Sequence, residues 1–104
     1  MLPTYRVIVS PEAFDDLDSI FEYIKQHSPQ NAAATIDRLW KAAQSLATFP
    51  HRFKVYRHSR RPELVIRAMS VRPFAIYYRV VEESSTVRVL TVRHGARKPP
   101  RFGK

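Results

Sequence analysis

Two amphipathic helical segments precede three β-rich runs in this chain, and this order limits its possible folds more than any other feature. Apolar residues recur at helical spacing from Phe14 to Ile24 and again from Ile36 to Leu46. From Leu64 onward, the chain is rich in β-branched and aromatic residues. Helices grouped together before a run of strands predict an α+β fold and not an alternating α/β fold.

Residues suited to helix caps set the predicted boundaries of the two helices. Ser10 suits an N-cap and Pro11 suits the first helical position. Pro29 disfavours helical geometry in the residue before it, so the first helix is predicted to end near His27. A second helix is predicted over about Gln30–Ala47. Because the connection is short, the two helices are expected to form an antiparallel hairpin.

The remaining elements are predicted to form a small antiparallel sheet with the helical hairpin on one face. The segment His51–Pro62 is rich in cations and has no clear period, so it is predicted to be a surface connection. The polar turn before Thr86 lacks glycine, which favours a loop longer than two residues. The expected architecture is β-α-α-β-β-β, with strands over Tyr5–Val9, Leu64–Arg72, Phe74–Val81 and Thr86–Arg93.

The period of two in the last strands leaves neither face of the sheet wholly polar, which indicates that the face away from the helices meets a macromolecule. Tyr77 and Tyr78 point to opposite faces, so one is expected in the core and the other at the surface. Trp40 is expected in the core between helices and sheet. Gly95 is expected to supply a backbone conformation that lets the chain leave the sheet. In the strand Phe74–Val81, one face is predicted to carry the side chains of Ala75, Tyr77, Arg79 and Val81. In the next strand, one face is predicted to carry those of Val87, Val89, Thr91 and Arg93.

Positive charge is concentrated in the second half of the chain. Of the 18 Lys and Arg residues, 14 lie between His51 and Lys104 with only three acids, so this half carries a charge of +11 and the first half −2. Such a split does not define a fold, but it predicts an anionic partner for the basic half. The 104 residues are predicted to form a single domain over 1–104 with a basic tail at about 95–104.

The composition also excludes several classes of site. The chain has no cysteine, which rules out disulfides, thiolate metal ligands and a cysteine nucleophile. His27, His51 and His58 have no acidic or histidine neighbour at ligand spacing, so neither a metal site nor a cofactor is expected. There is no signal peptide pattern and no long apolar segment, which predicts a cytoplasmic protein without membrane contact.

Three segments in this order resemble the ParE and RelE superfamily, the toxins of bacterial type II toxin–antitoxin modules. They are SPEAFDDLDSIFEYI after the opening strand, the helix ending in LATFP, and the block PFAIYYRVVEESSTVRVLTVRHGAR. The resemblance covers nearly the whole chain and is most specific at the last strand, which ends in His-Gly-Ala-Arg. It implies a cognate antitoxin as partner and a hetero-oligomeric toxin–antitoxin complex.

Two chemistries occur in this superfamily, and the fold does not separate them. ParE-like toxins poison DNA gyrase by trapping it on cleaved DNA, whereas RelE-like toxins cut mRNA on the ribosome without a metal. The resemblance implies that a nuclease of this superfamily has an Arg near the start of the third strand and an Arg and a Tyr in the C-terminal segment. In this chain the strand position corresponds to Ala75, although a register shift could offer Arg72, and the tail lacks Tyr. The sequence therefore favours a gyrase poison that is not itself an enzyme, with a ribosome-dependent mRNA endonuclease and a non-catalytic nucleic-acid-binding module as alternatives.

The predicted functional residues lie mostly in the C-terminal block. If the chain is a nuclease, the candidates for catalysis are His94, whose reference pKa of ~6.5 suits proton transfer, with Arg93 and Arg97. The favoured interpretation is that His94, at the end of a strand and before a glycine, hydrogen-bonds the backbone and fixes the path by which the chain leaves the strand. Arginine suits contacts with anions through its planar fork, although strand arginines are also common as solvated edge charges. The residues predicted to bind the target are Arg72, Arg79, Arg93, His94, Arg97, Lys98 and Arg101.

Overall fold

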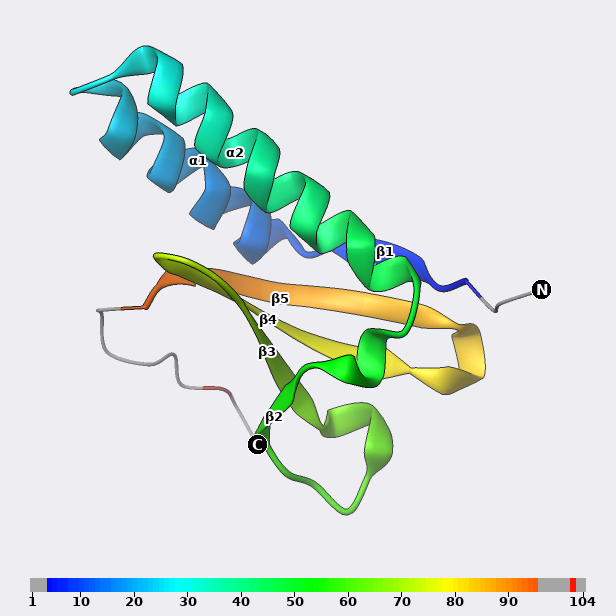
Figure 1. Cartoon of the computed structure of the whole chain (residues 1–104). Coiled ribbons are helices and arrows are strands. Elements are labelled where there is room, and N and C mark those ends of the chain that lie inside the picture. The colour runs from blue at the N-terminus through cyan, green and yellow to red at the C-terminus, as the bar shows by residue number, and fades with distance from the viewer. Residues whose placement is uncertain (1–3, 96–101, 103–104) are drawn as a thin grey trace.

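The computed structural model describes residues 4–95 and Phe102, and it shows two helices packed on one face of a five-stranded mixed sheet (Figure 1). The strand order is β1-β5-β4-β3-β2. The predicted α+β class, the helical hairpin and its place on the sheet are confirmed. The elements are β1 (Arg6–Val9), α1 (Pro11–Lys25), α2 (Pro29–Gln44), β2 (Lys54–Arg57), β3 (Ile66–Val71), β4 (Phe74–Val81) and β5 (Thr86–His94), with short 3-10 turns at Ser45–Ala47 (η1), Pro50–Arg52 (η2), Pro62–Leu64 (η3) and Glu82–Ser84 (η4).

Both helices begin at a serine cap that is followed by proline. The Ser10 hydroxyl accepts a hydrogen bond from the Ala13 N–H at 3.1 Å, and the Ser28 hydroxyl accepts one from the Asn31 N–H at 3.3 Å. Each bond satisfies an N–H that has no partner inside its own helix. The second helix therefore begins at Pro29, one residue before the predicted start.

The hydrophobic core lies between the helices and the inner face of the sheet. Leu17, Leu39 and Leu46 from the helical side pack against strand residues such as Ile76 and Tyr78. The prediction that Trp40 lies in this core is wrong. Its side chain is 38% exposed and packs against exposed Phe14 of the other helix, with ring centroids 5.8 Å apart. Leu39 takes the inward position, because neighbouring helical residues point about 100° apart.

The sheet differs from the predicted antiparallel one at both edges. Strand β1 pairs with β5 in parallel, so the first strand turns the sheet into a mixed one. The predicted surface connection over His51–Pro62 contains strand β2, which pairs antiparallel with β3 through Lys54, Val55 and Arg57. This strand has only four residues and charged ends, as is common at a sheet edge. It therefore lacks the alternation that would identify it in the sequence.

A β-bulge at Leu90 changes which side chains of β5 share a face. Tyr77 pairs with Thr91 whereas Tyr78 pairs with Val89, so Leu90 is an extra residue without an opposite partner. The predicted face of Val87, Val89, Thr91 and Arg93 is therefore wrong. Val87 and Val89 face the helices, while Thr91 and Arg93 face away from them beside Tyr77 and Ala75.

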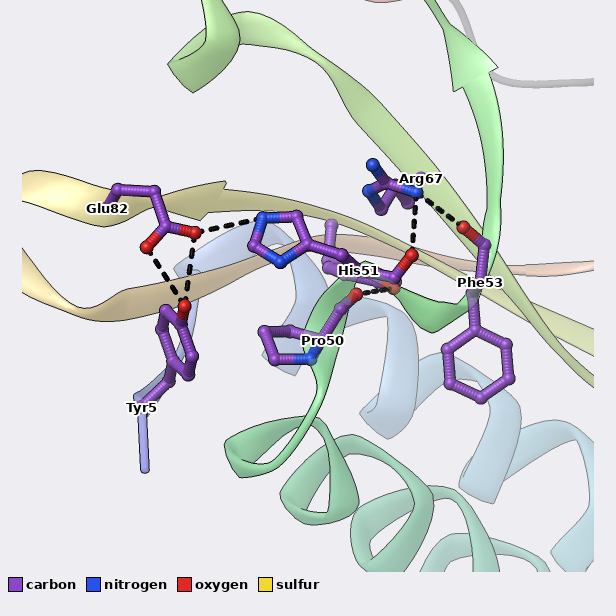
Figure 2. A network of polar contacts seen from close by, with 7 residues as sticks. Tyr5, Pro50, His51, Phe53, Arg67 and Glu82 are labelled. Atoms are coloured by element: carbon purple, nitrogen blue, oxygen red, sulfur yellow. Dashed lines mark hydrogen bonds and ion pairs between the residues drawn. The ribbon is translucent and has the colours of Figure 1, made fainter. Parts of the chain in front are cut away.

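A network of polar contacts fixes the segment that leads from the helices into the sheet (Figure 2). Tyr78 is fully buried, and its hydroxyl donates to the carbonyl of Pro50. Arg67 donates to the carbonyls of His51 and Phe53 at 3.0 and 2.7 Å. Burial raises the pKa of Tyr78 to about 12, because the charged phenolate loses its hydration there.

A second part of the same network ties the first strand to the turn between β4 and β5. The Tyr5 hydroxyl donates to Glu82 Oε1 at 2.9 Å, and His51 Nε2 lies 2.9 Å from Glu82 Oε2 (Figure 2). The hydrogen bond to the carboxylate raises the pKa of Tyr5, since ionisation would place two negative charges together. The turn spans residues 82–85 and ends at Ser85 with a φ of 48°, which agrees with the predicted longer loop.

Gly95 has a different role from the predicted one. Its φ is not positive, and its N–H donates to the carbonyl of Pro73 at 2.7 Å. A Cβ atom at this position would lie 3.1 Å from that carbonyl oxygen. The absence of a side chain therefore allows the close approach of two backbone segments, and the chain needs no unusual backbone angle to leave the sheet.

Candidate functional site

The sheet surface opposite the helices, here called the outer face, carries a set of cations. Pairing between neighbouring strands places these side chains on one side, because directly opposite residues point to the same face. None of the five strands contains Asp or Glu. The strand cations on the outer face, together called the cationic face, are Arg6, Lys54, Arg57, Arg79, Arg88 and Arg93.

A chain of hydrogen bonds from helix α1 holds Arg93 in place. The Asp16 carboxylate accepts from the Thr91 hydroxyl and from the Val92 N–H, the latter at 3.0 Å. Strand β1 ends at Val9, so this N–H has no neighbouring strand, and the carboxylate satisfies it instead. The Thr91 oxygen in turn accepts from Arg93 Nε at 3.1 Å. Asp16 and Thr91 therefore orient the guanidinium of Arg93 on the outer face.

Aromatic side chains lie among these cations. Tyr77 is only 9% exposed although it points away from the core. Its ring lies 4.9 Å from that of Tyr56 and 5.8 Å from that of Phe102, centroid to centroid. Arg57 Nη1 donates to the carbonyl of Phe102 at 2.9 Å. The prediction that one of the two adjacent tyrosines is exposed is wrong, since these contacts cover Tyr77.

Burial in this cluster raises the pKa of the Tyr77 hydroxyl, and the neighbouring Tyr56 adds to the effect. Tyr77 therefore keeps its proton at neutral pH and can donate a hydrogen bond to an anion. The cluster combines an uncharged donor with cations, which is an arrangement suited to holding an anionic surface.

The structure brings only some of the predicted site residues together. Arg79 and Arg93 lie on the outer face, as their pairing partners show. His94 pairs with Phe74 and packs its ring against that residue at 5.5 Å, so it faces the opposite side from Arg93. Arg72 lies at the turn before β4, and its carbonyl accepts from Arg38 Nη2 at 2.9 Å. Arg97, Lys98 and Arg101 lie outside the described residues.

The sequence prediction missed Arg6, Lys54, Arg57 and Arg88. Their signal is the period of two, which assigns them to the outer face once the pairing of β1 and β2 is known. Thr91 and Asp16 carried no functional signal, because they act through a contact between residues 75 positions apart.

Across residues 4–95 and Phe102, no three His, Asp or Glu side chains gather where they could hold a metal ion. Among the same residues, neither helix combines the length and the apolar character needed to cross a membrane.

Comparisons with known proteins give a consistent result. Residues 7–99 match the family model described as the ParE toxin of the type II toxin–antitoxin system parDE. The chain is 37% identical over 92 residues to Toxin RelE2 of Caulobacter vibrioides, a match that covers 88% of this chain and 97% of that protein.

Solved structures show the same fold. The chromosomal ParDE system from P. aeruginosa aligns with a TM-score of 0.68 at 19% identity, over 88% of this chain and 96% of that one. The toxin–antitoxin complex RelBE2 from Mycobacterium tuberculosis aligns with a TM-score of 0.61 at 25% identity, over 90% and 94% of the two chains. The family resemblance identified from the sequence is confirmed.

Proposed function

Because this chain belongs to the ParE family of toxins from type II toxin–antitoxin systems, within the ParE and RelE superfamily, we propose that it inhibits DNA gyrase by stabilising the complex of gyrase with cleaved DNA. The cationic face is the surface proposed to contact this target. Guanidinium groups pair with phosphates through a planar fork, and the positive charge of the chain steers it toward DNA. The proposed target acts in the cytoplasm, so the protein is proposed to act there as well.

This proposal is supported chiefly by the kinds of side chain that the outer face of the sheet carries. Metal-independent RNA cleavage needs a group that accepts the 2′-OH proton and a group that protonates the leaving oxygen. The strands contribute cations and tyrosines to the outer face, but no Asp or Glu, and their single histidine, His94, packs against Phe74 on the other side. Such a surface supports binding of an anionic target more readily than proton transfer.

We propose that a cognate antitoxin neutralises the toxin in a hetero-oligomeric complex. The solved structures with this fold include toxin–antitoxin complexes. The chain carries a formal net charge of +9, and its strand surface holds no acid to balance that charge. An acidic partner that covers the cationic face would block the proposed contact with gyrase.

A cleavage assay tests the proposal. The toxin is incubated with gyrase, ATP and supercoiled plasmid, and the reaction is stopped with detergent and protease. Linear plasmid is expected to accumulate with toxin concentration, and the cognate antitoxin should abolish it. The Arg93→Ala variant should need more toxin for the same effect, whereas Arg60→Ala, an exposed arginine outside the strands, should behave like the wild type.

A second candidate function is ribosome-dependent mRNA cleavage, which the name of the 37% identical relative Toxin RelE2 supports. Mapping transcript ends after toxin induction separates the two functions. Cut transcripts without linear plasmid would establish the nuclease. Binding of nucleic acid with steep salt dependence and without either product would instead indicate a simple binding module.

A further inference from the structure

Two arginines of the cationic face stand directly opposite each other. Arg79 of β4 and Arg88 of β5 are Cα partners in the antiparallel ladder, so their side chains leave the same side of the sheet. Like charges in directly opposed positions destabilise a sheet. Among the described residues, neither guanidinium forms an ion pair with a carboxylate. Within residues 4–95 and Phe102, no carboxylate therefore balances these two like charges.

Arg79 carries a second unfavourable feature. Its Nε atom is buried and has no hydrogen-bond partner within residues 4–95 and Phe102. A buried N–H without an acceptor loses its hydration and gains nothing in return. The neighbours of the pair on this face include two apolar side chains, since Ile8 is the partner of Arg88 across β1 and β5, and Val81 follows on the same face of β4. An oxyanion seated between the two arginines would relieve both features.

The surroundings favour a single carboxylate over a chain of phosphates. Strand β4 runs directly into the turn that carries Glu82 and Glu83, both exposed. The Glu82 carboxylate already contacts Tyr5 and His51, but Glu83 would repel the successive charges of a nucleic-acid backbone, whereas one carboxylate needs space for one charge only. Half-buried Ile8 and Val81 also suit the apolar side chains of a peptide. These surroundings therefore favour the acidic side chain of a polypeptide as the ligand of the two arginines.

We propose that Arg79 and Arg88 form a carboxylate-binding site that an acidic side chain of the cognate antitoxin fills, an inference that rests on the proposed toxin function. A protein that is stored in a complex can keep a pair of arginines that destabilises its free form, because the partner supplies the missing acceptor. The two arginines thus lower the stability of the free chain and raise its affinity for the antitoxin.

The test compares Arg88→Gln with Arg60→Gln, a control at an exposed arginine in the loop between β2 and β3. Two quantities are measured for each full-length chain, namely the Tm without partner and the Kd for the purified cognate antitoxin. For Arg88→Gln, we expect the Tm to rise by about 1–5 °C as the repulsion disappears. We expect the Kd to rise about tenfold as a charged hydrogen bond is lost. The control should change neither quantity.

A double-mutant cycle extends the test to the second arginine. Arg79→Met removes the unpaired Nε while it keeps an unbranched apolar side chain. If both arginines hold one carboxylate, the double variant should weaken antitoxin binding by less than the product of the two single effects. Multiplicative effects would contradict a shared site.

A second set of measurements compares the affinity of the wild type and of Arg88→Gln for single-stranded DNA, for duplex DNA oligonucleotides and for the complex of gyrase with DNA. The proposal is overturned if Arg88→Gln leaves antitoxin affinity unchanged, or if it weakens DNA or gyrase–DNA binding tenfold instead. It is supported if antitoxin affinity falls about tenfold while DNA and gyrase–DNA binding fall by a clearly smaller factor. Failure of the wild-type chain to trap gyrase would refute the proposed target but would leave the result of the antitoxin arm valid, so the two failures are distinguishable.

Discussion

Replacing Thr91 with valine tests whether the contact from Asp16 positions Arg93. The side chain of Thr91 is fully buried, and valine keeps its shape while it removes the hydroxyl. The Asp16 carboxylate would keep its bond to the Val92 N–H at 3.0 Å but would lose the second donor. A hydrogen bond to a charged group contributes about 1.5–3 kcal/mol, so the free energy of unfolding should fall by that amount. The Tm should then fall by about 6–24 °C for a domain of this size.

The functional effect should exceed what lower stability alone causes. Without the Thr91 oxygen, Arg93 Nε loses its acceptor at 3.1 Å, and the guanidinium is free to rotate away from its bound orientation. We expect Thr91→Val to raise the toxin concentration needed for half-maximal gyrase trapping about 3–10-fold, measured well below the Tm of each variant. Thr91→Ser keeps the hydroxyl and should retain near wild-type trapping despite some loss of packing.

A double-mutant cycle with Arg93→Ala identifies the route of the effect. If Thr91 acts through Arg93, then Thr91→Val should have no further effect on trapping in the Arg93→Ala background. Equal loss of trapping in both backgrounds would refute the positioning role. The same conclusion would follow if Thr91→Val lowered the Tm and left trapping unchanged.

Three further predictions concern the fold. Tyr78→Phe should lower the free energy of unfolding by about 1–3 kcal/mol in denaturant titrations, because the carbonyl of Pro50 loses its donor. The pKa of Tyr78 is raised to about 12 in the folded chain, so its contribution to the free energy of unfolding is complete below pH 10 and is lost as the pH rises toward 12. Denaturant titrations at several pH values across this range should therefore show a smaller loss of stability with pH for Tyr78→Phe than for the wild type. Ser10→Ala should cost about 1 kcal/mol through loss of the helix cap, and Ser10→Asn should restore most of it; equal stability of the two variants would contradict the capping role.

The helices could be predicted because their signals are local. The caps at Ser10 and Ser28 and the apolar spacing within each helix depend on residues a few positions apart. Trp40 shows the limit of this reasoning. The helical stripe contains it, but whether the indole is buried depends on the space between two helices and a sheet, and Leu39 occupies that space.

The sheet was predicted less completely because its pairing is set by distant residues. Strand β2 has four residues and no alternation, and the parallel pairing of β1 depends on the path of the helical hairpin. The bulge at Leu90 adds one residue to β5, so the alternation of faces shifts by one position there. An uninterrupted period of two therefore places Thr91 and Arg93 on the same face as Val87 and Val89, which is wrong.

The candidate site followed the same pattern. Arg79 and Arg93 could be found from the sequence as strand cations. Lys54 and Arg88 required the register, and the link from Asp16 to Arg93 required the position of α1 beside the free edge of β5. The period of two predicted that His94 and Arg93 lie on opposite faces, but only the pairing of His94 with Phe74 shows that His94 faces the helices and Arg93 faces away from them.

The claim that this chain inhibits gyrase is best tested by measuring how much linear plasmid gyrase forms as the toxin concentration rises. We expect linear DNA to accumulate with the wild-type toxin and the cognate antitoxin to abolish it. We expect Arg93→Ala to shift the curve to higher toxin concentration without a matching loss of stability. The claim is contradicted if the folded wild-type toxin forms no linear plasmid while transcripts are cut on ribosomes after its induction.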